Sequence, residues 1–351
     1  MIIKGRIMTI ETNITKMLGI KHPIIAAPMG PFYTTDLTIA VSEAGGLGVI
    51  SHVGLSDADP VEEMKKNMKT VVEYTDKPFG FNIRTSRMEP NAEMLCWEIP
   101  KFIMENQKIR DQCVYALTSA GSAKILPNAP PYQKLKENSE IKHFHVAPAL
   151  WLAEKCVSAG VDGLVVTGGE GGGHQSYEKV STLVVLQQVH QKFPEVPMVA
   201  CGGFATGEGL AAALSLGAGA VAMGSRFIAS KESEFHDTYK NVVPPAKAQD
   251  TIMATGVFGP IRLWKNEYAR EHKPITSKEE KLAQEATFDV DEIAKTIRAY
   301  ELAYEGNIND GAVLLGQSIG LIDSIESVSD IMERIMKDAE AAVRNAVSLV
   351  K

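Results

Sequence analysis

The stretch PMVACGGFATGEGLAAALSLGAGAVAMGSRF, residues 197–227, contains the repeating unit that decides the fold. Its apolar runs at 197–203 and 220–225 are nearly continuous, as expected of strands buried on both faces of a parallel sheet. The segment between them, 207–218, has the pattern of a helix. Strand, helix and strand in this order predict a parallel βαβ unit.

The same alternation extends back along the chain to residue 23. Six more apolar runs are predicted as strands: 23–28, 47–51, 78–83, 113–119, 143–147 and 163–168. Helical patterns lie at 34–45, 60–75, 91–106, 149–160 and 181–193. The long polar stretch 84–142 is expected to hold a helix, the fourth strand, and an elaborated loop with a further helix. Eight strand–helix units predict an α/β fold, a closed (β/α)8 TIM barrel rather than an open doubly wound sheet.

The C-terminal part of the chain has a different pattern. Residues 291–306 and 327–351 have the spacing of amphipathic helices, whereas 256–272 mixes turn residues with aromatic ones. No strand pattern stands out there. The sequence therefore predicts a barrel over 12–245 and a helical extension over 246–351 that packs on the barrel mouth.

Composition excludes several classes of protein. With 351 residues, 45% hydrophobic and 23% charged, the chain is neither disordered nor dependent on a disulfide scaffold. A net charge of −7 argues against a nucleic-acid partner. No apolar run reaches the roughly 18 residues of a membrane span, and no signal peptide is expected. The four cysteines (Cys96, Cys113, Cys156 and Cys201) lack CxxC spacing, which favours a cytoplasmic protein without a metal site.

The glycines cluster where three predicted strands end, at 167–174, 201–209 and 223–227. In a βα barrel, the active site lies at these strand ends. Gly202 and Gly203, with Gly224 and Ser225 on the next strand, would place backbone N–H groups side by side. Such an arrangement binds phosphate, here of a mononucleotide cofactor or a phosphorylated substrate, although the same glycines could serve only tight turns. No GxGxxG follows the first strand, so a Rossmann dinucleotide site is not predicted.

Three other features concern the chemistry. His174 ends a glycine-rich run at the catalytic rim and is a candidate for proton transfer, the alternative being a structural histidine. Glu170 could orient His174, contact the loop backbone or face solvent. His143 and His145 alternate on a strand without a third ligand, so no metal is expected.

Two segments could hold a planar ring. AAPMGPF, residues 26–32, is short and apolar and could form a flat platform. Asn82, at the end of the third strand, could hydrogen-bond a ring heteroatom or simply cap the strand.

Together these motifs resemble the flavin-dependent nitronate monooxygenase family and the related FMN-dependent enoyl-acyl-carrier-protein reductases. The resemblance covers residues 12–330 and rests on APM at 27–29, AVSEAGGLGVIS at 40–51, FGFN at 79–82, EGGGH at 170–174, the stretch 200–227 and GQSIGLI at 316–322. It implies a TIM barrel that binds FMN. A nucleotide dehydrogenase of the inosine-monophosphate type is disfavoured, because residues 167–182 contain no nucleophilic cysteine.

The resemblance also implies roles for individual residues. His174 is the expected catalytic base, which takes the proton α to a nitro group. Pro28 and Met29 would lie against the flavin ring, with Asn82 and Gly172 in contact with it. The expected cofactor site is completed by Thr167, Gly202, Gly203, Ala222, Met223, Gly224 and Ser225.

The implied reaction is oxidation of a small alkyl nitronate by O2 to a carbonyl compound and nitrite. The alternative is an enoyl-thioester reductase that uses NAD(P)H, because residues 175–185 are somewhat closer to the reductases. Thr167 stands where many monooxygenases have glutamine, which weakens the choice of substrate. A catalytically silent flavin- or phosphate-binding protein is a third alternative, and a homodimer is left open.

Overall fold

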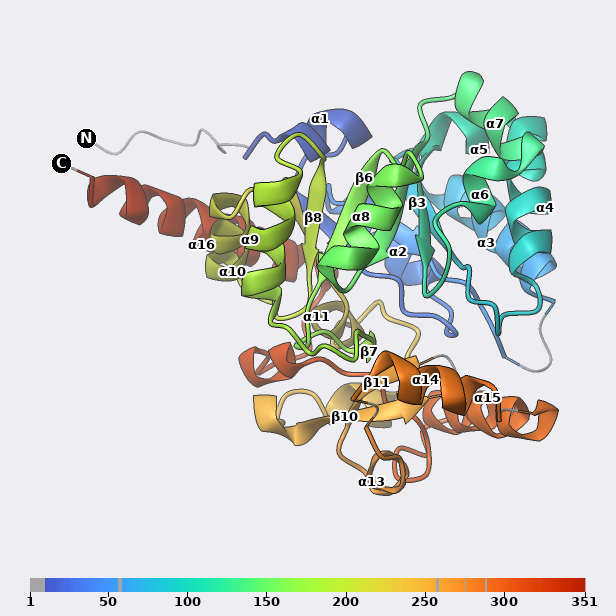
Figure 1. The fold of residues 1–351 in the computed structure, drawn as a ribbon. Coiled ribbons are helices and arrows are strands. Elements are labelled where there is room, and N and C mark those ends of the chain that lie inside the picture. The colour runs from blue at the N-terminus through green and yellow to red at the C-terminus, as the bar shows by residue number, and fades with distance from the viewer. Residues whose placement is uncertain (1–9, 56–58, 257–258, 275, 288, 351) are drawn as a thin grey trace.

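The computed structural model describes residues 10–55, 59–256, 259–274, 276–287 and 289–350. Eight parallel strands form a barrel surrounded by helices, and the C-terminal part adds a small sheet and further helices at one end (Figure 1). The barrel strands are β1 (Ile24–Ala26), β2 (Gly48–Ile50), β3 (Phe79–Arg84), β4 (Cys113–Ser119), β5 (Lys142–Ala147), β6 (Gly163–Thr167), β8 (Met198–Cys201) and β9 (Ala220–Met223). The predicted TIM-barrel fold is therefore confirmed.

The strand order is β1-β9-β8-β6-β5-β4-β3-β2, and the first and last strands meet. The N–H of Leu47 donates to the Ile24 carbonyl at 3.0 Å, and the N–H of Ala26 donates to the Leu47 carbonyl at 2.9 Å. These bonds close the barrel. Its interior contains Tyr115 and Phe144, which are fully buried.

Helices surround the barrel and close its ends. They are α1 (Asn13–Leu18), α2 (Thr35–Glu43), α3 (Pro60–Tyr74), α4 (Ala92–Glu105), α5 (Gln107–Gln112), α6 (Ile125–Asn128), α7 (Pro130–Glu137), α8 (Leu150–Ser158), α9 (Thr182–Lys192), α10 (Gly207–Ser215), α11 (Ser225–Ile228) and α12 (Asp237–Asn241). Helix α3 illustrates the local signals. Asp59 caps it by accepting hydrogen bonds from the N–H groups of Val61 and Glu62, and Pro60 occupies its first turn. The stretch 84–142 contains the predicted fourth strand as β4, with two helices before it (α4 and α5) and two after it (α6 and α7) where one was expected on each side.

The C-terminal part is not wholly helical, so that expectation was wrong. Strands β10 (Thr251–Gly256) and β11 (Gly259–Trp264) pair antiparallel, and β11 also pairs with β7 (Gly173–His174) in the barrel's glycine-rich loop. The glycines and proline of this hairpin look like turn residues in the sequence. Helices α13 (Glu267–Glu271), α14 (Lys278–Glu285) and α15 (Val290–Tyr304) follow the hairpin.

The last helix, α16 (Val328–Ser348), returns to the barrel wall and packs against α10 and α2. A Cβ on Gly207 would lie 2.4 Å from the Ala339 nitrogen, so α10 and α16 are in close contact. Helix α16 therefore occupies the position of the outer helix after the eighth strand, where α11 is only one turn long.

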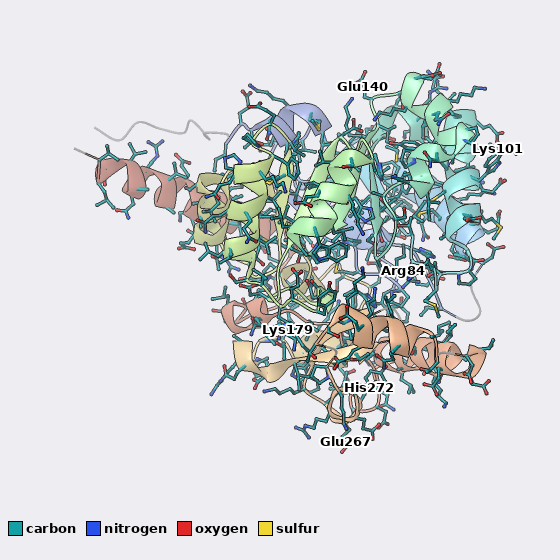
Figure 2. All side chains as sticks on the ribbon, in the orientation of Figure 1. Arg84, Lys101, Glu140, Lys179, Glu267 and His272 are labelled. Atoms are coloured by element: carbon teal, nitrogen blue, oxygen red, sulfur yellow. The ribbon has the colours of Figure 1, made fainter. Side chains whose placement is uncertain are left out.

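In the part of the chain that the structure describes, no helix has both the length and the apolar composition to cross a bilayer. All four cysteines are free thiols. Figure 2 labels Arg84 where barrel and C-terminal part meet, and Lys101 on the outer side of α4.

Candidate active site

A cavity of about 960 Å³ lies at the carboxyl ends of the barrel strands, and residues of the C-terminal part, among them Lys281 and Leu314, also line it. This volume is at the upper end of the roughly 300–1,000 Å³ found for small-molecule sites. Eleven of the twelve predicted site residues line it: Pro28, Met29, Asn82, Thr167, Gly172, His174, Gly202, Gly203, Ala222, Gly224 and Ser225. Met223 does not line the cavity. Side chains alternate between the two faces of β9, and the side chain of Met223 is buried in the hydrophobic core outside the barrel.

The phosphate cradle (Gly202, Gly203, Gly224 and Ser225) lies at the ends of β8 and β9. Gly203 has φ +89°, a conformation that strains any other residue. A Cβ on Gly202 would come within 2.9 Å of the Gly171 Cα, so the β6 and β8 loops require glycine where they meet. In the described residues, the N–H groups of Gly203 and Gly224 donate to no other group. These donors and the Cβ-free space beside them fit a phosphate.

The hydroxyl of Ser225 also faces this cradle. Its oxygen accepts a hydrogen bond from the Gly316 N–H at 3.0 Å, which leaves the hydroxyl proton available to a ligand. The contact links the motif at 316–322 to the cradle, so this distant segment supports the site through the main chain.

Asn82 has a structural role in the barrel, whereas its contact with a ring stays a prediction. Its Nδ2 donates to the Leu117 carbonyl and to Ser119 Oγ, at 3.2 Å each, which joins β3 to β4. With the nitrogen occupied, its Oδ1 is the acceptor left for a ring N–H. On the first strand end, the N–H of Met29 donates to Ser51 Oγ at 2.8 Å, which fixes the turn that follows Pro28.

The loop that carries His174 is held by the C-terminal hairpin. His174 pairs with Ile261 of β11, and the N–H of Gln175 donates to the Pro260 carbonyl at 2.8 Å. The Nε of Arg262 donates to the Gly169 carbonyl at 2.6 Å. The hairpin therefore presents His174 on the edge of a strand.

Glu170 contacts the loop backbone, which settles its three alternatives. Its Oε2 accepts hydrogen bonds from the N–H and hydroxyl of Thr182, at 2.8 and 3.0 Å. It thus ties the loop to the first turn of α9 and does not orient His174.

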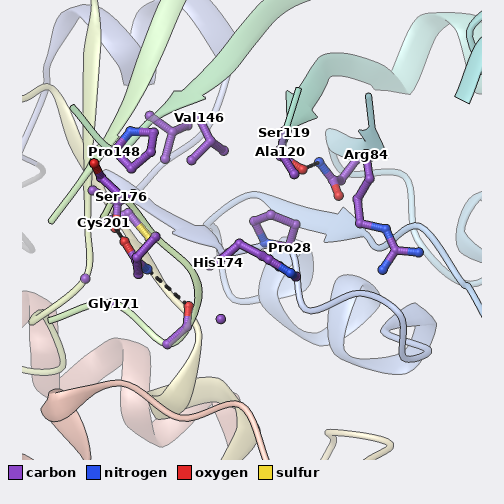
Figure 3. Close-up of a pocket in the computed structure, with 18 of the residues that line it drawn as sticks. Pro28, Arg84, Ser119, Ala120, Val146, Pro148, Gly171, His174, Ser176 and Cys201 are labelled. Atoms are coloured by element: carbon purple, nitrogen blue, oxygen red, sulfur yellow. Dashed lines mark hydrogen bonds between the residues drawn. The ribbon is translucent and has the colours of Figure 1, made fainter. Parts of the chain in front are cut away.

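His174 is neutral at physiological pH. Burial, and then the positive charges of Arg84 and Lys281, lower its pKa from 6.5 to about 3. A neutral imidazole can accept a proton. Figure 3 shows His174 and Arg84 projecting into the cavity from different elements.

Sequence reasoning missed these two cations. Arg84 ends β3, and its Nη2 donates to Glu89 Oε2 at 2.8 Å, so a buried carboxylate positions it. Lys281 comes from α14 and lies over the hairpin turn, where a Cβ on Gly259 would be 3.2 Å from its Cε. Both side chains line the cavity. Only the tertiary fold brings them to His174, and no spacing in the sequence predicts that.

Gln175 was also missed. It is buried, its Nε2 donates to the Gly172 carbonyl at 3.3 Å, and its Oε1 lies 3.5 Å from the Thr167 hydroxyl. The carboxamide of Gln175 therefore lies against Thr167, the position at which many nitronate monooxygenases have glutamine.

Comparison with known proteins identifies the family. The sequence model described as nitronate monooxygenase matches residues 11–338, nearly the whole chain. The chain belongs to the nitronate monooxygenase family. It is an enzyme, an oxidoreductase, as the motifs predict.

Members and neighbours of this family differ in reaction. The chain is 28% identical to a nitronate monooxygenase of Paraburkholderia phytofirmans, over 93% of the chain and 96% of that protein. It is 30% identical to a (3aS,4S,5R,7aS)-5-hydroxy-7a-methyl-1-oxo-octahydro-1H-indene-4-carboxyl-CoA dehydrogenase of Rhodococcus jostii, over 94% and 96%. The structure of FabK from Thermotoga maritima matches with a TM-score of 0.80 and 32% identity, over 97% and 100%. The family alone therefore does not fix the substrate.

Proposed function

We propose that the chain is an FMN-dependent oxidoreductase that moves a proton at the carbon α to an acidifying group, with alkyl nitro compounds and their nitronates as first candidate substrates. The observation that carries this proposal is that His174, Arg84 and Lys281 line the same cavity as the phosphate cradle. The cradle would hold the single phosphate of FMN, and Pro28, Met29 and Asn82 would hold its ring. When bound, FMN supplies the electron acceptor.

The protein's own groups account for the proton and the charge. His174 takes the α proton, because its imidazole is unprotonated at neutral pH. Arg84 and Lys281 stabilise the anion that remains, since fixed charges in a buried site act strongly on developing charge. The nitronate is then oxidised with O2 to a carbonyl compound and nitrite. A cytoplasmic location and a homodimer remain predictions.

A second candidate is an acyl or enoyl thioester, with NAD(P)H as co-substrate. The specific observation in its favour is the cavity itself, which is large for a cofactor and a small nitronate and whose lining includes five cationic side chains. The Rhodococcus relative, named for a CoA thioester, supports the same direction. A thioester also acidifies its α carbon, so the roles of His174, Arg84 and Lys281 carry over.

Anaerobic mixing of the flavin-loaded protein with each reductant separates these candidates. Propionate 3-nitronate is added in one cuvette and NADPH in another, with free FMN as the control for direct reduction. Loss of the flavin absorbance near 450 nm, roughly the visible band of an oxidised flavin, with nitronate supports the first candidate. Bleaching with NADPH alone supports the second, and no bleaching with either contradicts both.

A further inference from the structure

The cavity has a second polar end that the proposed function does not use. The phosphate cradle is at β8 and β9, whereas this end is at β4 and β5, across the barrel in the strand order. We call it the far rim; its residues are Ser122, Lys124, Trp151 and Lys155. The first two follow β4, and the other two lie on α8, the helix after β5.

The charge of the cavity is opposite to that of the whole chain. Its lining contains five cationic side chains, namely Arg84, Arg87, Lys124, Lys155 and Lys281. Glu154 is the one carboxylate among the described lining residues, and it pairs with Lys192. The chain as a whole carries −7. An overall acidic protein that concentrates positive charge in one cavity selects an anionic ligand there.

Two of these cations are available to a ligand. In the described part of the chain, neither Lys124 nor Lys155 forms an ion pair with a carboxylate. Both side chains are exposed at the cavity entrance. Lys124 comes from the loop after β4, and Lys155 comes from the last turn of α8.

Trp151 adds an aromatic surface. It is 36% exposed, although large aromatic side chains are usually well buried. Lys155 Nζ lies 4.9 Å from its ring centroid, so a positive charge accompanies the indole. Exposed aromatic rings beside lysines bind bases by stacking while the lysines neutralise phosphates.

We propose that the far rim binds a phosphorylated adenosine, with the base against Trp151 and the phosphates at Lys124 and Lys155, and that the chain attached to it extends toward His174. The inference rests on the proposed function only in assigning the cradle to FMN. Two molecules share this chemistry: the CoA part of an acyl thioester and the adenosine half of NAD(P)H.

Calorimetric titration of the FMN-loaded protein with adenosine 3′,5′-bisphosphate and adenosine 2′,5′-bisphosphate tests the proposal without turnover. At least one of the two bisphosphates is expected to bind. Tighter binding of the 3′,5′ isomer would assign the far rim to CoA, and tighter binding of the 2′,5′ isomer would assign it to NADPH. The double variant Lys124→Gln/Lys155→Gln should weaken binding at least about tenfold, since each lysine neutralises phosphate charge. Trp151→Ala should weaken it, and Trp151→Phe should retain most of it.

Lys101→Gln is the matched control, because Lys101 is an exposed lysine on the outer side of α4 and is expected to leave binding unchanged. All variants should keep their flavin content, which shows that they fold. The proposal is overturned if neither bisphosphate binds at millimolar concentration, or if the double variant binds as well as Lys101→Gln. Since flavin bleaching by nitronate needs no adenosine, failure here leaves the proposed function standing, and failure of bleaching leaves this binding measurable.

Discussion

The cradle end of the cavity is built from main chain, and the opposite side is built from side chains. At the cradle, Gly203 and Gly224 offer N–H groups, and no side chain larger than a serine takes part. On the opposite side, Arg84, Lys281 and the far rim contribute charge and an aromatic ring from four separate elements. A site made of main-chain groups depends on backbone conformation, so a residue larger than glycine should abolish binding there. In a site made of side chains, each substitution should weaken binding only in part.

Gly203→Val should have the largest effect, because it changes the main-chain conformation of the phosphate cradle. The valine would be strained at φ +89°, and its Cβ would lie 3.5 Å from the Cβ of Glu170, so the cradle backbone would have to change. We expect the purified variant to lose nearly all its flavin, measured as absorbance per chain. Gly160→Val is the matched control. Gly160 has φ +76° and no atom within 4 Å of its Cβ position, so this variant shares the strain but should retain flavin. Equal flavin loss in both would assign the effect to strain alone.

His174→Asn should come next. Loss of a general base costs about 10²–10⁴-fold, so turnover of a neutral nitroalkane should fall by at least two decades. The pre-formed nitronate has already lost its proton and should be largely spared, and flavin should remain bound. Steady-state assays with both substrates measure the split. Equal losses on both would mean that His174 positions the anion and does not take a proton.

Arg84→Met should have a moderate effect, about tenfold or more on kcat/KM for the neutral substrate, since a charge-assisted contact to the anion is lost. Removing this cation also lets the pKa of His174 rise from about 3. The acidic limb of the pH profile, below which His174 is protonated, should therefore move to higher pH. Arg84→Lys keeps the charge and should move the limb less. An unmoved limb in Arg84→Met would separate Arg84 from His174.

The smallest effect concerns the pH dependence of the free energy of unfolding and involves His145 on β5. Burial lowers the pKa of His145 to about 3, so unfolding takes up a proton there below pH 6.5. The free energy of unfolding should fall with decreasing pH by roughly 1.4 kcal/mol per unit for this histidine. His145→Gln should reduce that slope between pH 6 and pH 5, roughly the upper part of the window between 6.5 and about 3. Urea unfolding measures it. A slope in His145→Gln identical to that of the unsubstituted protein would contradict the burial argument.

The two ends also differ in how far sequence predicts them. Glycine clusters after β6, β8 and β9 indicate the cradle directly, because backbone that must adopt positive φ restricts residue choice at single positions. All eight barrel strands are equally clear as apolar runs. No comparable sequence pattern singles out Arg84 or Lys281. The hairpin of β10 and β11 was hidden by its glycines and proline, and with it the partner strand that fixes His174.

The identity of the bound cofactor tests the central claim most directly. The protein is purified without added flavin, and the cofactor released by heat is compared with FMN and FAD standards by chromatography and mass. A cradle for one phosphate, with no dinucleotide motif beside it, predicts a yellow protein that releases FMN at nearly one per chain. Release of FAD, or a colourless protein that does not take up FMN, would contradict the account.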